Sequence, residues 1–454
     1  MHRPTPRRLA ALSFLALLVA AAQPAKAVEV QRVVSDSGIE AWLVEDHANP
    51  VISVNISVPG GAAHDPEGKA GLANMATSLL DEGAGDLKSQ EFQARLAEKA
   101  IKLSFDASSD DVRGTLRTLT KHRGDAADML SLALTEPRFD KPAIERIRSQ
   151  VLANIARRSA RPSSKANRAL DRVLFPKHPY GHRVRGNPGT VKTIGRDDLV
   201  GFADKRFVRD RLIVGVAGDI TPDQLKAWLD RAFGDLPASG GKLREVPESQ
   251  TKGDGARVVI EQNVPQAWVA FGHGGIKRDD PDYYAASLLN YILGGGSFAS
   301  RLFEEVREKR GLVYSVYSYI NPMDKAAVMA GGLGTSNAQV GEAVAVVRKE
   351  WTRLAENGPT EQELADAKTH LVGSFSQRLS STKKIARVLV AMQRNELGID
   401  YIDEREDLIE AVTMKEAKRV AARMLKPDDL AVVVVGKPQG FEANRKPPRI
   451  SPGG

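Results

Sequence analysis

Arg307 and Tyr314, seven positions apart, carry side chains that could act on a peptide. A tyrosine hydroxyl can donate to the oxyanion of a tetrahedral intermediate, and an arginine can bind a peptide carbonyl or a carboxylate. Each residue also has a structural interpretation. Arg307 lies in a charged run that suits an exposed helix, and Tyr314 lies in an apolar run that suits a half-buried strand. Chemistry alone favours the structural interpretation.

The segment Gly294–Ser318 predicts how this pair is positioned. Three successive glycines end one helix, and Ser297 or Ser300 can cap the next. That helix ends at Gly311 after two cationic residues, and an apolar strand follows. The glycine run lacks the G-K-[ST] ending of a phosphate-binding loop, so a nucleotide site is not expected.

Histidines could supply a metal site, and the sequence has eight of them. Only His178 and His182 are close in sequence, in His-Pro-Tyr-Gly-His. Pro179 and Gly181 make this stretch a loop, so the pair does not share a helical face and a structural or solvent-facing role is favoured over a metal site. The sequence contains no Cys, which excludes thiolate chemistry, and no H-E-x-x-H motif.

Residues 71–78, Gly-Leu-Ala-Asn-Met-Ala-Thr-Ser, resemble a motif of the insulinase-type (pitrilysin) metallopeptidase family. Active members carry G-[apolar]-A-H-x-x-E-H here, in which both His hold zinc and the Glu is the general base. Gly71–Ala73 match this pattern, but the three functional positions hold Asn74, Thr77 and Ser78. Asn and Thr are poor zinc ligands, and none of the three can take a proton from water near neutral pH.

A further position of the same site is also changed. Active members of the family supply a third ligand, a Glu, from a second helix about 75 residues further on. The helix expected at 142–158 has Asn154 in the equivalent position, with 75 residues between it and Ser78. Four positions in register are therefore altered. The sequence predicts that this degenerate zinc site, defined as Asn74, Thr77, Ser78 and Asn154, holds no metal.

The resemblance changes the interpretation of Arg307 and Tyr314. The family carries an R-x-x-x-x-x-x-Y pair at this helix-to-strand corner, where it points from the C-terminal half toward the metal site. Some bacterial members are heterodimers in which one chain holds zinc and the other supplies the Arg/Tyr pair. The resemblance therefore implies that Arg307 and Tyr314 act in trans, in a catalytic site completed by a partner.

The N-terminus has the pattern of a cleavable signal peptide. Arg3, Arg7 and Arg8 precede an apolar run from Leu9 to Ala22, and Ala25-Lys26-Ala27 fits the cleavage site. The alternative is a membrane anchor, but a run of this length is shorter than the ~20 residues that span a bilayer. We expect cleavage after Ala27 and a periplasmic protein without stable membrane insertion. The net charge then falls from +8 to +4, a mild excess that does not indicate nucleic-acid binding.

The chain repeats one structural plan. Alternating apolar strands are expected at 51–61 and 266–275, each followed by a helix, and closing strands at 212–218 and 430–436. The offsets of 215 and 218 residues indicate a duplication. The predicted fold is α+β: two homologous domains of mixed or antiparallel sheet packed with helices, which form a clamshell. The expected boundaries are signal peptide 1–27, first domain 28–238, linker 239–255, second domain 256–440 and flexible tail 441–454.

Two functions of different class follow. The first is the non-zinc-binding subunit of a periplasmic zinc metallopeptidase, inactive alone, paired with a homologous H-x-x-E-H subunit that holds zinc and cleaves peptides. The second is a peptide-binding or scaffolding protein without a catalytic role. An autonomous peptidase is disfavoured, because the sequence has neither a convincing metal set nor a G-x-S-x-G motif.

Overall fold

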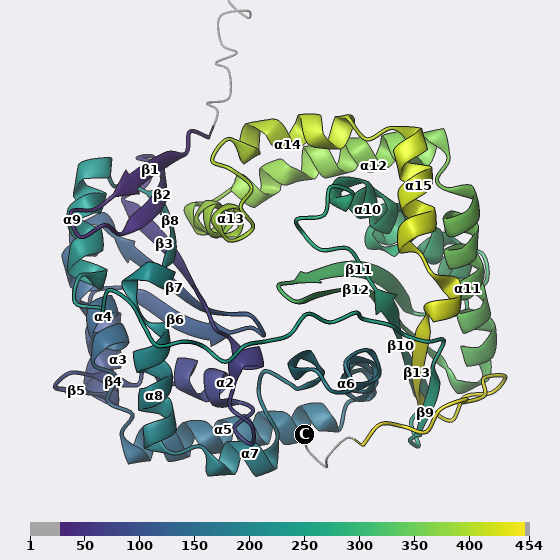
Figure 1. Ribbon diagram of the computed structural model, residues 1–454, viewed down its shortest axis with the longest axis horizontal. Coiled ribbons are helices and arrows are strands. Elements are labelled where there is room, and N and C mark those ends of the chain that lie inside the picture. Colours follow the sequence, from purple (N-terminus) through teal and green to yellow (C-terminus); the bar gives the residue numbers. More distant parts are fainter. Residues whose placement is uncertain (1–27, 450–454) are drawn as a thin grey trace, which may run out of the picture.

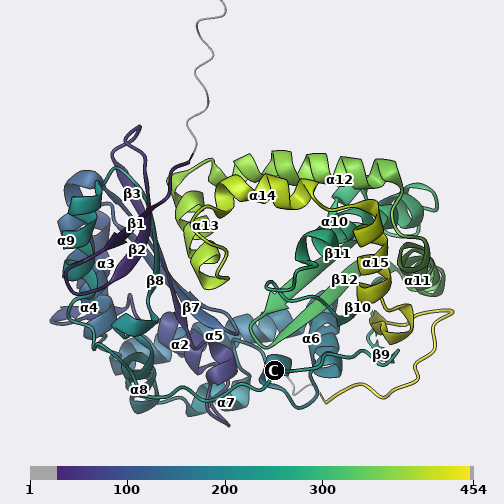
Figure 2. The ribbon, with the colours of Figure 1, turned by 45° about the horizontal axis from the view of Figure 1, so that its top comes forward.

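The structure, a computed structural model, describes residues 28–449 and consists of two α+β halves joined side by side (Figures 1 and 2). The predicted signal peptide at 1–27 lies outside the described residues. Among residues 28–449, no helix is both long and apolar enough to cross a membrane.

The first half is built on a six-stranded sheet in the order β1-β2-β8-β3-β7-β6. Its strands are β1 (Gln31–Val34), β2 (Glu40–Glu45), β3 (Val51–Pro59), β6 (Lys102–Ala107), β7 (Asp111–Leu119) and β8 (Ile213–Gly218). Its helices are α2 (Leu72–Thr77), α3 (Ser89–Glu98), α4 (Arg123–Thr135), α5 (Lys141–Ser159), α6 (Pro162–Leu174), α7 (Pro188–Thr193), α8 (Arg196–Arg206) and α9 (Pro222–Phe233). A short hairpin, β4 (Gly83–Ala84) and β5 (Leu87–Lys88), precedes α3.

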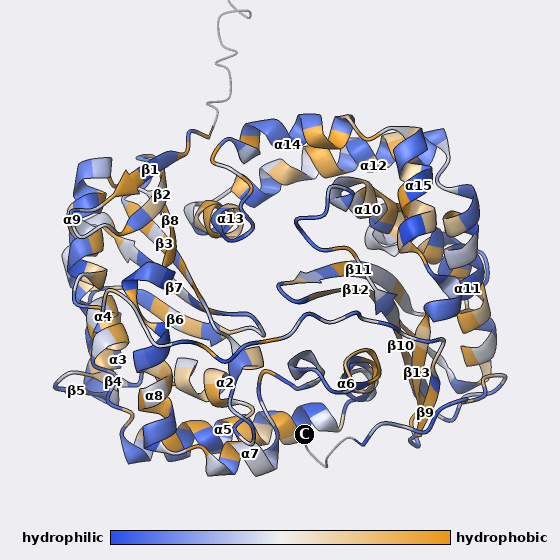
Figure 3. Cartoon of the chain, viewed as in Figure 1, coloured by the Kyte–Doolittle hydropathy of each residue, from blue (hydrophilic) through white to orange (hydrophobic). Residues whose placement is uncertain are grey.

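The second half is built on a five-stranded sheet in the order β11-β12-β10-β13-β9. Its strands are β9 (Arg257–Glu261), β10 (Gln266–Gly274), β11 (Ser315–Met323), β12 (Ala326–Ser336) and β13 (Ala431–Gly436). Its helices are α10 (Tyr283–Asn290), α11 (Val340–Asn357), α12 (Glu361–Gly373), α13 (Thr382–Arg394), α14 (Tyr401–Glu410) and α15 (Met414–Met424). The strands β9, β10 and β13 are rich in hydrophobic residues, as expected for strands covered on both faces (Figure 3).

The second sheet repeats the strand order and directions of the first. The strands β2-β8-β3-β7-β6 correspond to β9-β13-β10-β12-β11. In each set the first pair is parallel and the other pairs are antiparallel. This arrangement confirms the predicted α+β class and the repeated plan, with β1 as an addition to the first half.

Each sheet is covered on one face by a helix from the other half. Helix α13 lies on β2, β3 and β8, and α6 lies on β10 and β13 (Figures 1 and 2). The apolar side of α13, including Ile385 and Leu389, forms a core with Trp42 and Val44. Gly215 permits this packing, because a Cβ there would lie 2.4 Å from the Ala386 carbonyl oxygen. The two halves are therefore mutually interlocked.

The alternation expected in β3 is present, but neither of its faces is exposed to solvent. Its apolar side chains, such as Val54, join the core of the first half. Its polar side chains lie under α13, where Ser53 and Thr382 share a hydrogen bond of 2.9 Å and Asn55 donates to the Lys383 carbonyl. The polar side chains of β3 therefore contact the other half. The sequence had predicted that this face of the strand would be exposed to solvent.

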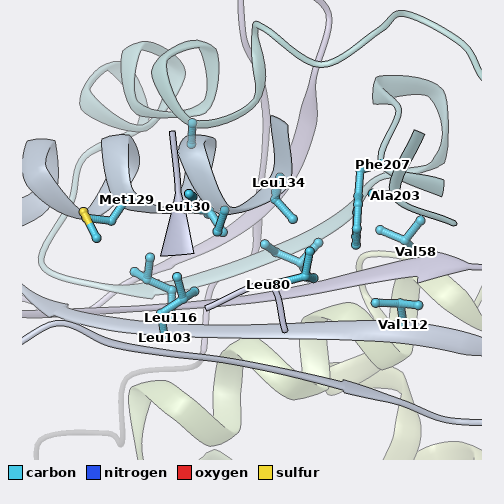
Figure 4. Packing of buried hydrophobic residues seen from close by; sticks show 14 of the residues in the cluster. Val58, Leu80, Leu103, Val112, Leu116, Met129, Leu130, Leu134, Ala203 and Phe207 are labelled. Carbon is cyan, nitrogen blue, oxygen red and sulfur yellow. The ribbon is translucent and has the colours of Figure 1, made fainter. Parts of the chain in front are cut away.

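The opposite face of the first sheet carries the largest core. Figure 4 shows Leu103, Val112 and Leu116 on the strands beneath Leu130 and Leu134 of α4. Leu80, directly after α2, is fully buried in the same cluster. Helix α2 is thereby fixed against the sheet.

The predicted linker starts on the first half, where Arg244 donates to the Asp65 carbonyl, and reaches the second half, where the Ser249 N–H donates to the Lys325 carbonyl. Residues 239–255 contain neither helix nor strand. Part of the expected flexible tail is packed, because the Asn444 backbone N–H and side-chain amide donate to the Arg257 and Gly255 carbonyls. Phe441 also packs on the core of the second half. Packing of Phe441 and hydrogen bonds from residues 444 and 445 thus hold this part of the tail on the second half.

An ion-pair cluster joins the halves where the β6–β7 and β11–β12 turns meet. Arg394, the last residue of α13, contacts Asp111 at 3.2 Å and Asp324 at 2.7 Å. The Asp111 side chain is 2% exposed and also pairs with Arg113. The Tyr180 hydroxyl donates to Asp110 and accepts from the Lys325 backbone N–H.

We expect Arg394→Ala to lower the free energy of unfolding by about 2 kcal/mol, because it removes one of two guanidinium partners of a buried carboxylate. Urea unfolding monitored by circular dichroism measures this change. Arg95→Ala, at an exposed position of α3, is the matched control. An unfolding curve for Arg394→Ala that coincides with that of the control would contradict the prediction.

Candidate functional site

The degenerate zinc site is held by a short helix with a buried acidic cap. Gly71 precedes α2 with φ of +102°, a conformation that favours glycine. The buried Asp65 carboxylate accepts hydrogen bonds from the Gly71 N–H at 2.9 Å and the Ala73 N–H at 3.0 Å. Burial raises the pKa of Asp65 to about 7, against the effect of these two hydrogen bonds. The backbone entering the site is therefore fixed by a carboxyl group that the sequence analysis did not single out.

Three of the four side chains at the degenerate site are engaged in local hydrogen bonds. The Thr77 hydroxyl donates to the Ala73 carbonyl at 2.9 Å, and the Ser78 hydroxyl donates to the Asn74 carbonyl at 2.7 Å. The Asn154 carbonyl oxygen accepts from Arg157 on the same helix. The hydroxyls bond back to the preceding turn, where α2 ends. Thr77 and Ser78 thus satisfy backbone carbonyls and Asn154 pairs with Arg157, which is a structural use of these positions.

These residues do not fit a zinc ion. Zinc sites take imidazole, thiolate or carboxylate ligands, and the four positions supply two amides and two hydroxyls. Helix α2 packs against α5, so the elements that carry the four positions do lie together. Among the described residues, no group of three or more His, Asp or Glu is placed to hold a metal.

Arg307 and Tyr314 lie on either side of a tight helix-to-strand turn. Arg307 lies in a π-helical turn, Phe303–Glu308, and its guanidinium stacks over the Phe303 ring at 4.6 Å. Gly311, with φ of +62°, ends the helix, and its N–H donates to the Arg307 carbonyl. The Tyr314 N–H donates to the Gly334 carbonyl, so its backbone is fixed to β12, while 66% of the residue is exposed.

This corner is also the most exposed aromatic surface of the described chain. Phe298 is 78% exposed and packs edge-on against Phe303 at 4.7 Å. Phe298 and Tyr314 are the two most exposed large hydrophobic residues among positions 28–449. Exposed aromatic groups of this kind are typical of binding surfaces. Within the described residues, no hydrogen bond or ion pair links Arg307 or Tyr314 to the degenerate site.

The helix start predicted before this corner differs in the structure. Ser297 has φ of +50° and lies in a short 3-10 turn, Ser297–Ala299, without a side-chain cap. The preceding glycines continue a π-helical turn, Tyr291–Gly295. Ser297 is therefore not the cap. Ser300, the alternative start, directly precedes the helix with an extended backbone, and its carbonyl accepts the Glu304 N–H, while its hydroxyl donates to the Ser297 carbonyl.

His178 and His182 have the structural surroundings that the loop pattern favoured. His178 is buried, its Nε2 lies 2.8 Å from the Pro247 carbonyl, and its Nδ1 accepts from the Tyr180 N–H. It packs against the rings of Phe175 and Tyr180. Burial lowers the pKa of His182, as does the nearby Arg172. The 3-10 turn between the two histidines keeps them on separate parts of the loop.

Two cavities lie between the halves, and their walls are rich in arginine. One of about 880 Å³ lies between β3 and β7 on one side and α10, α13 and α14 on the other. Six arginines and two aspartates line it. The other, of about 370 Å³, lies between α6 and the strands β11 and β12, and four arginines and one aspartate line it. This concentration of charge was not predicted from the sequence. A count over residues 157–185, which have nine Lys and Arg and one acidic residue, would have indicated it.

Comparisons with known proteins identify the family. Residues 41–187 match the profile of Insulinase (Peptidase family M16), and residues 193–371 match that of the Peptidase M16 inactive domain. The chain belongs to peptidase family M16. It is 31% identical, over 382 residues, to the Non-peptidase homolog YmxG of Helicobacter pylori, which covers 81% of this chain and 88% of that protein.

A second M16 relative is named as a zinc protease, and a solved M16 structure has the same fold as this chain. The Uncharacterized zinc protease YmxG of Bacillus subtilis is 23% identical over 410 residues, covering 89% of this chain and 98% of that one. The crystal structure of a peptidase M16 inactive domain from Pseudomonas fluorescens superposes with a TM-score of 0.84 and 27% identity, covering 91% and 99% of the two chains. The M16 relatives include both a non-peptidase homolog and proteins named as zinc proteases. The residues at the metal site therefore distinguish active from inactive members, and those of this chain make it an inactive M16 homologue.

We expect the single substitution Asn74→His not to create a zinc site, because Thr77, Ser78 and Asn154 still lack ligand groups. Equilibrium dialysis followed by metal analysis measures bound zinc per chain. The unaltered protein is the control. Stoichiometric zinc that resists dialysis in this single variant would contradict our account of the site.

Proposed function

We propose that this chain is the non-zinc-binding subunit of a heteromeric periplasmic M16 metallopeptidase. A homologous partner with an intact H-x-x-E-H motif holds the zinc and cleaves the peptide. This chain contributes Arg307 and Tyr314 to the partner's site, in trans. The observation that carries the proposal is the contrast between a degenerate metal site and a retained, exposed Arg/Tyr corner.

The geometry of the corner supports a role toward another molecule. The Tyr314 backbone is fixed to β12 while 66% of the residue is exposed, and within residues 28–449 no hydrogen bond occupies its hydroxyl, which leaves this donor available to another molecule. Stacking on Phe303 uses the planar face of the Arg307 guanidinium, so the N–H donors at its edge can bind a carbonyl or carboxylate. Phe298 adds apolar surface at the same corner, as the centre of a protein interface requires.

The two side chains would have separate roles in the complex. Arg307 would orient the peptide backbone by binding a carbonyl, which raises the effective concentration of the reacting bond. The Tyr314 hydroxyl would donate to the oxygen that gains negative charge as the tetrahedral intermediate forms. Zinc chemistry would belong to the partner alone, so this chain is expected to have no peptidase activity by itself.

The test is affinity purification of the tagged mature chain from its native periplasm, with mass spectrometry of the co-purified proteins. A near-stoichiometric M16 homologue with H-x-x-E-H is the expected result. Mixing the two purified chains should then restore zinc-dependent peptide cleavage. If the intact and abundant chain brings no such homologue, the proposal fails, and the alternative of a non-catalytic peptide-binding or scaffolding protein takes its place.

A further inference from the structure

The smaller cavity is an arginine pocket at the contact between the two halves. We use this name for the cavity of about 370 Å³ and its four arginines, Arg158, Arg168, Arg183 and Arg185. They come from the end of α5, from α6 and from the loop before α7. The opposite wall is formed by β11 and β12, including Tyr319. The volume suits one or a few side chains rather than a folded partner.

The pocket borders the degenerate zinc site. Arg158 lies one helical turn after Asn154 on α5, so the two share a face. The loop that carries Arg183 and Arg185 touches the start of α2, because a Cβ at Gly71 would lie 2.9 Å from the Arg185 carbonyl oxygen. A peptide held beside the degenerate site is therefore within reach of the four guanidinium groups.

The charges in the pocket are poorly balanced. Asp171 is the one acidic residue among the described residues that line it. Arg168 is only 4% exposed, and its burial, with Arg183 and Arg172 nearby, lowers its pKa to about 10. Burial also lowers the pKa of Arg185, as does the neighbouring Arg158. Guanidinium groups that disfavour one another's charge are stabilised when an anion enters between them.

The geometry favours a carboxylate as that anion. The planar guanidinium fork matches a carboxylate in two parallel hydrogen bonds. Arg183 is held in position because it donates to the Ser164 carbonyl at 2.9 Å. The Tyr319 hydroxyl and the side-chain amides of Asn167 and Asn321 supply further hydrogen-bonding groups to the same cavity.

We propose that the arginine pocket binds a carboxylate of an extended acidic peptide, either a Glu or Asp side chain or the C-terminus. The peptide nature of the ligand rests on the proposed function, but the pocket belongs to this chain alone. Its binding is therefore expected without any partner. A polynucleotide is the competing class of anion, and the small volume of the pocket disfavours it.

Isothermal titration calorimetry with the purified mature chain tests this proposal directly. The probes are decapeptides that are identical except for Glu, Gln or Lys at one central position, each with a free or an amidated C-terminus, and a ten-nucleotide oligothymidylate. We expect the Glu peptide to bind at least about tenfold more tightly than the Gln and Lys peptides. The advantage should shrink as salt is added.

Arg158→Gln/Arg185→Gln provides the matched variant, because both side chains are exposed to the cavity and their loss leaves the core intact. It should lose the tenfold advantage, whereas Arg95→Gln on the outer face of α3 should keep it. Tight binding that requires only a free C-terminus supports the proposal and assigns the carboxylate to the peptide end. Equal affinity for Glu and Gln peptides with amidated ends, and no effect of a free C-terminus, would overturn it. Tighter oligothymidylate binding, lost in the double variant, would also overturn it.

The two proposals fail in different ways. If no catalytic partner is found but acidic peptides still bind to the pocket, only the proposed function is lost. If the assembled peptidase cleaves Glu and Gln peptides with equal kcat/KM and this chain binds them equally, only the carboxylate site is lost.

Discussion

Tyr314→Phe is expected to lower kcat of the assembled peptidase by about 100-fold while the two subunits still associate. The substitution removes one hydroxyl, and losing a single oxyanion donor typically costs about 10²–10³ in kcat. The side chain is 66% exposed and its backbone is held by the Gly334 carbonyl, so folding and assembly need no contribution from the hydroxyl. Because the donor acts as charge develops, KM should change less than kcat.

Tyr317→Phe is the control for this experiment. Tyr317 lies on the adjoining strand β11, is 36% exposed and stacks with Tyr319 at 6.2 Å. It should retain the kcat of the unaltered complex. Kinetics with an unfolded peptide substrate, together with size-exclusion chromatography of each complex, gives both readouts. If the Tyr314→Phe complex turns over at the unaltered rate, the hydroxyl has no part in the reaction, and the exposed corner is a docking surface only.

The repeated sheet was predictable from sequence because its signals are local. Strand alternation and terminal glycines placed β3, β8, β10 and β13 to within about two residues. A Cβ at Gly218, for example, would lie 2.1 Å from the Val51 carbonyl oxygen, so the glycine that ends β8 is required by close packing. Such constraints act between neighbouring elements, and each can be recognised in the sequence, as the alternation and the terminal glycines were.

The exchange of α6 and α13 between the halves was not predictable in the same way. The apolar stripes of α6 and α13 specify that each helix packs on a sheet, but not on which sheet. The choice of sheet depends on the residues that each helix meets. Ser53 and Asn55 of β3 form hydrogen bonds with α13, and Gly215 of β8 leaves room for the Ala386 carbonyl. These residues were visible in the sequence, although their partners lie more than 170 positions away.

The candidate site was only partly predictable, for a related reason. The missing ligands at Asn74 and Asn154 were found because a motif has fixed spacing. The arginine pocket has no motif, because Arg158, Arg168 and Arg183 come from two helices and a loop and meet only in the fold. The net charge of +4 expected for the mature chain was interpreted as a diffuse excess, whereas the structure gathers ten arginines and three aspartates on the walls of two cavities.

The buried cap of α2 is expected to make the chain lose stability as the pH rises from 4 to 7. Burial raises the pKa of Asp65 from 3.8 to about 7, so the folded state holds a proton that the unfolded state releases. Its stabilising contribution is complete below pH 4, declines through the interval and is absent above pH 7. At about 1.4 kcal/mol per pKa unit, the decline between pH 5 and pH 8 amounts to about 2–3 kcal/mol.

Asp65→Asn isolates this effect, because the amide keeps the size of the side chain and an acceptor for the Gly71 or Ala73 N–H but cannot ionise. The stability of Asp65→Asn relative to the unaltered chain should therefore rise by about 2–3 kcal/mol between pH 5 and pH 8, because only the unaltered chain loses stability through this carboxyl. The difference in urea midpoint between the two proteins, measured at each pH, removes the contributions of all other titrating groups. Asp204→Asn, at an exposed position of α8, is the control and should follow the unaltered chain throughout. A constant difference between the unaltered chain and Asp65→Asn from pH 5 to pH 8 would mean that Asp65 stays ionised in the folded protein. Arg206, the buried cation beside Asp65, would then be holding the carboxylate in its charged form.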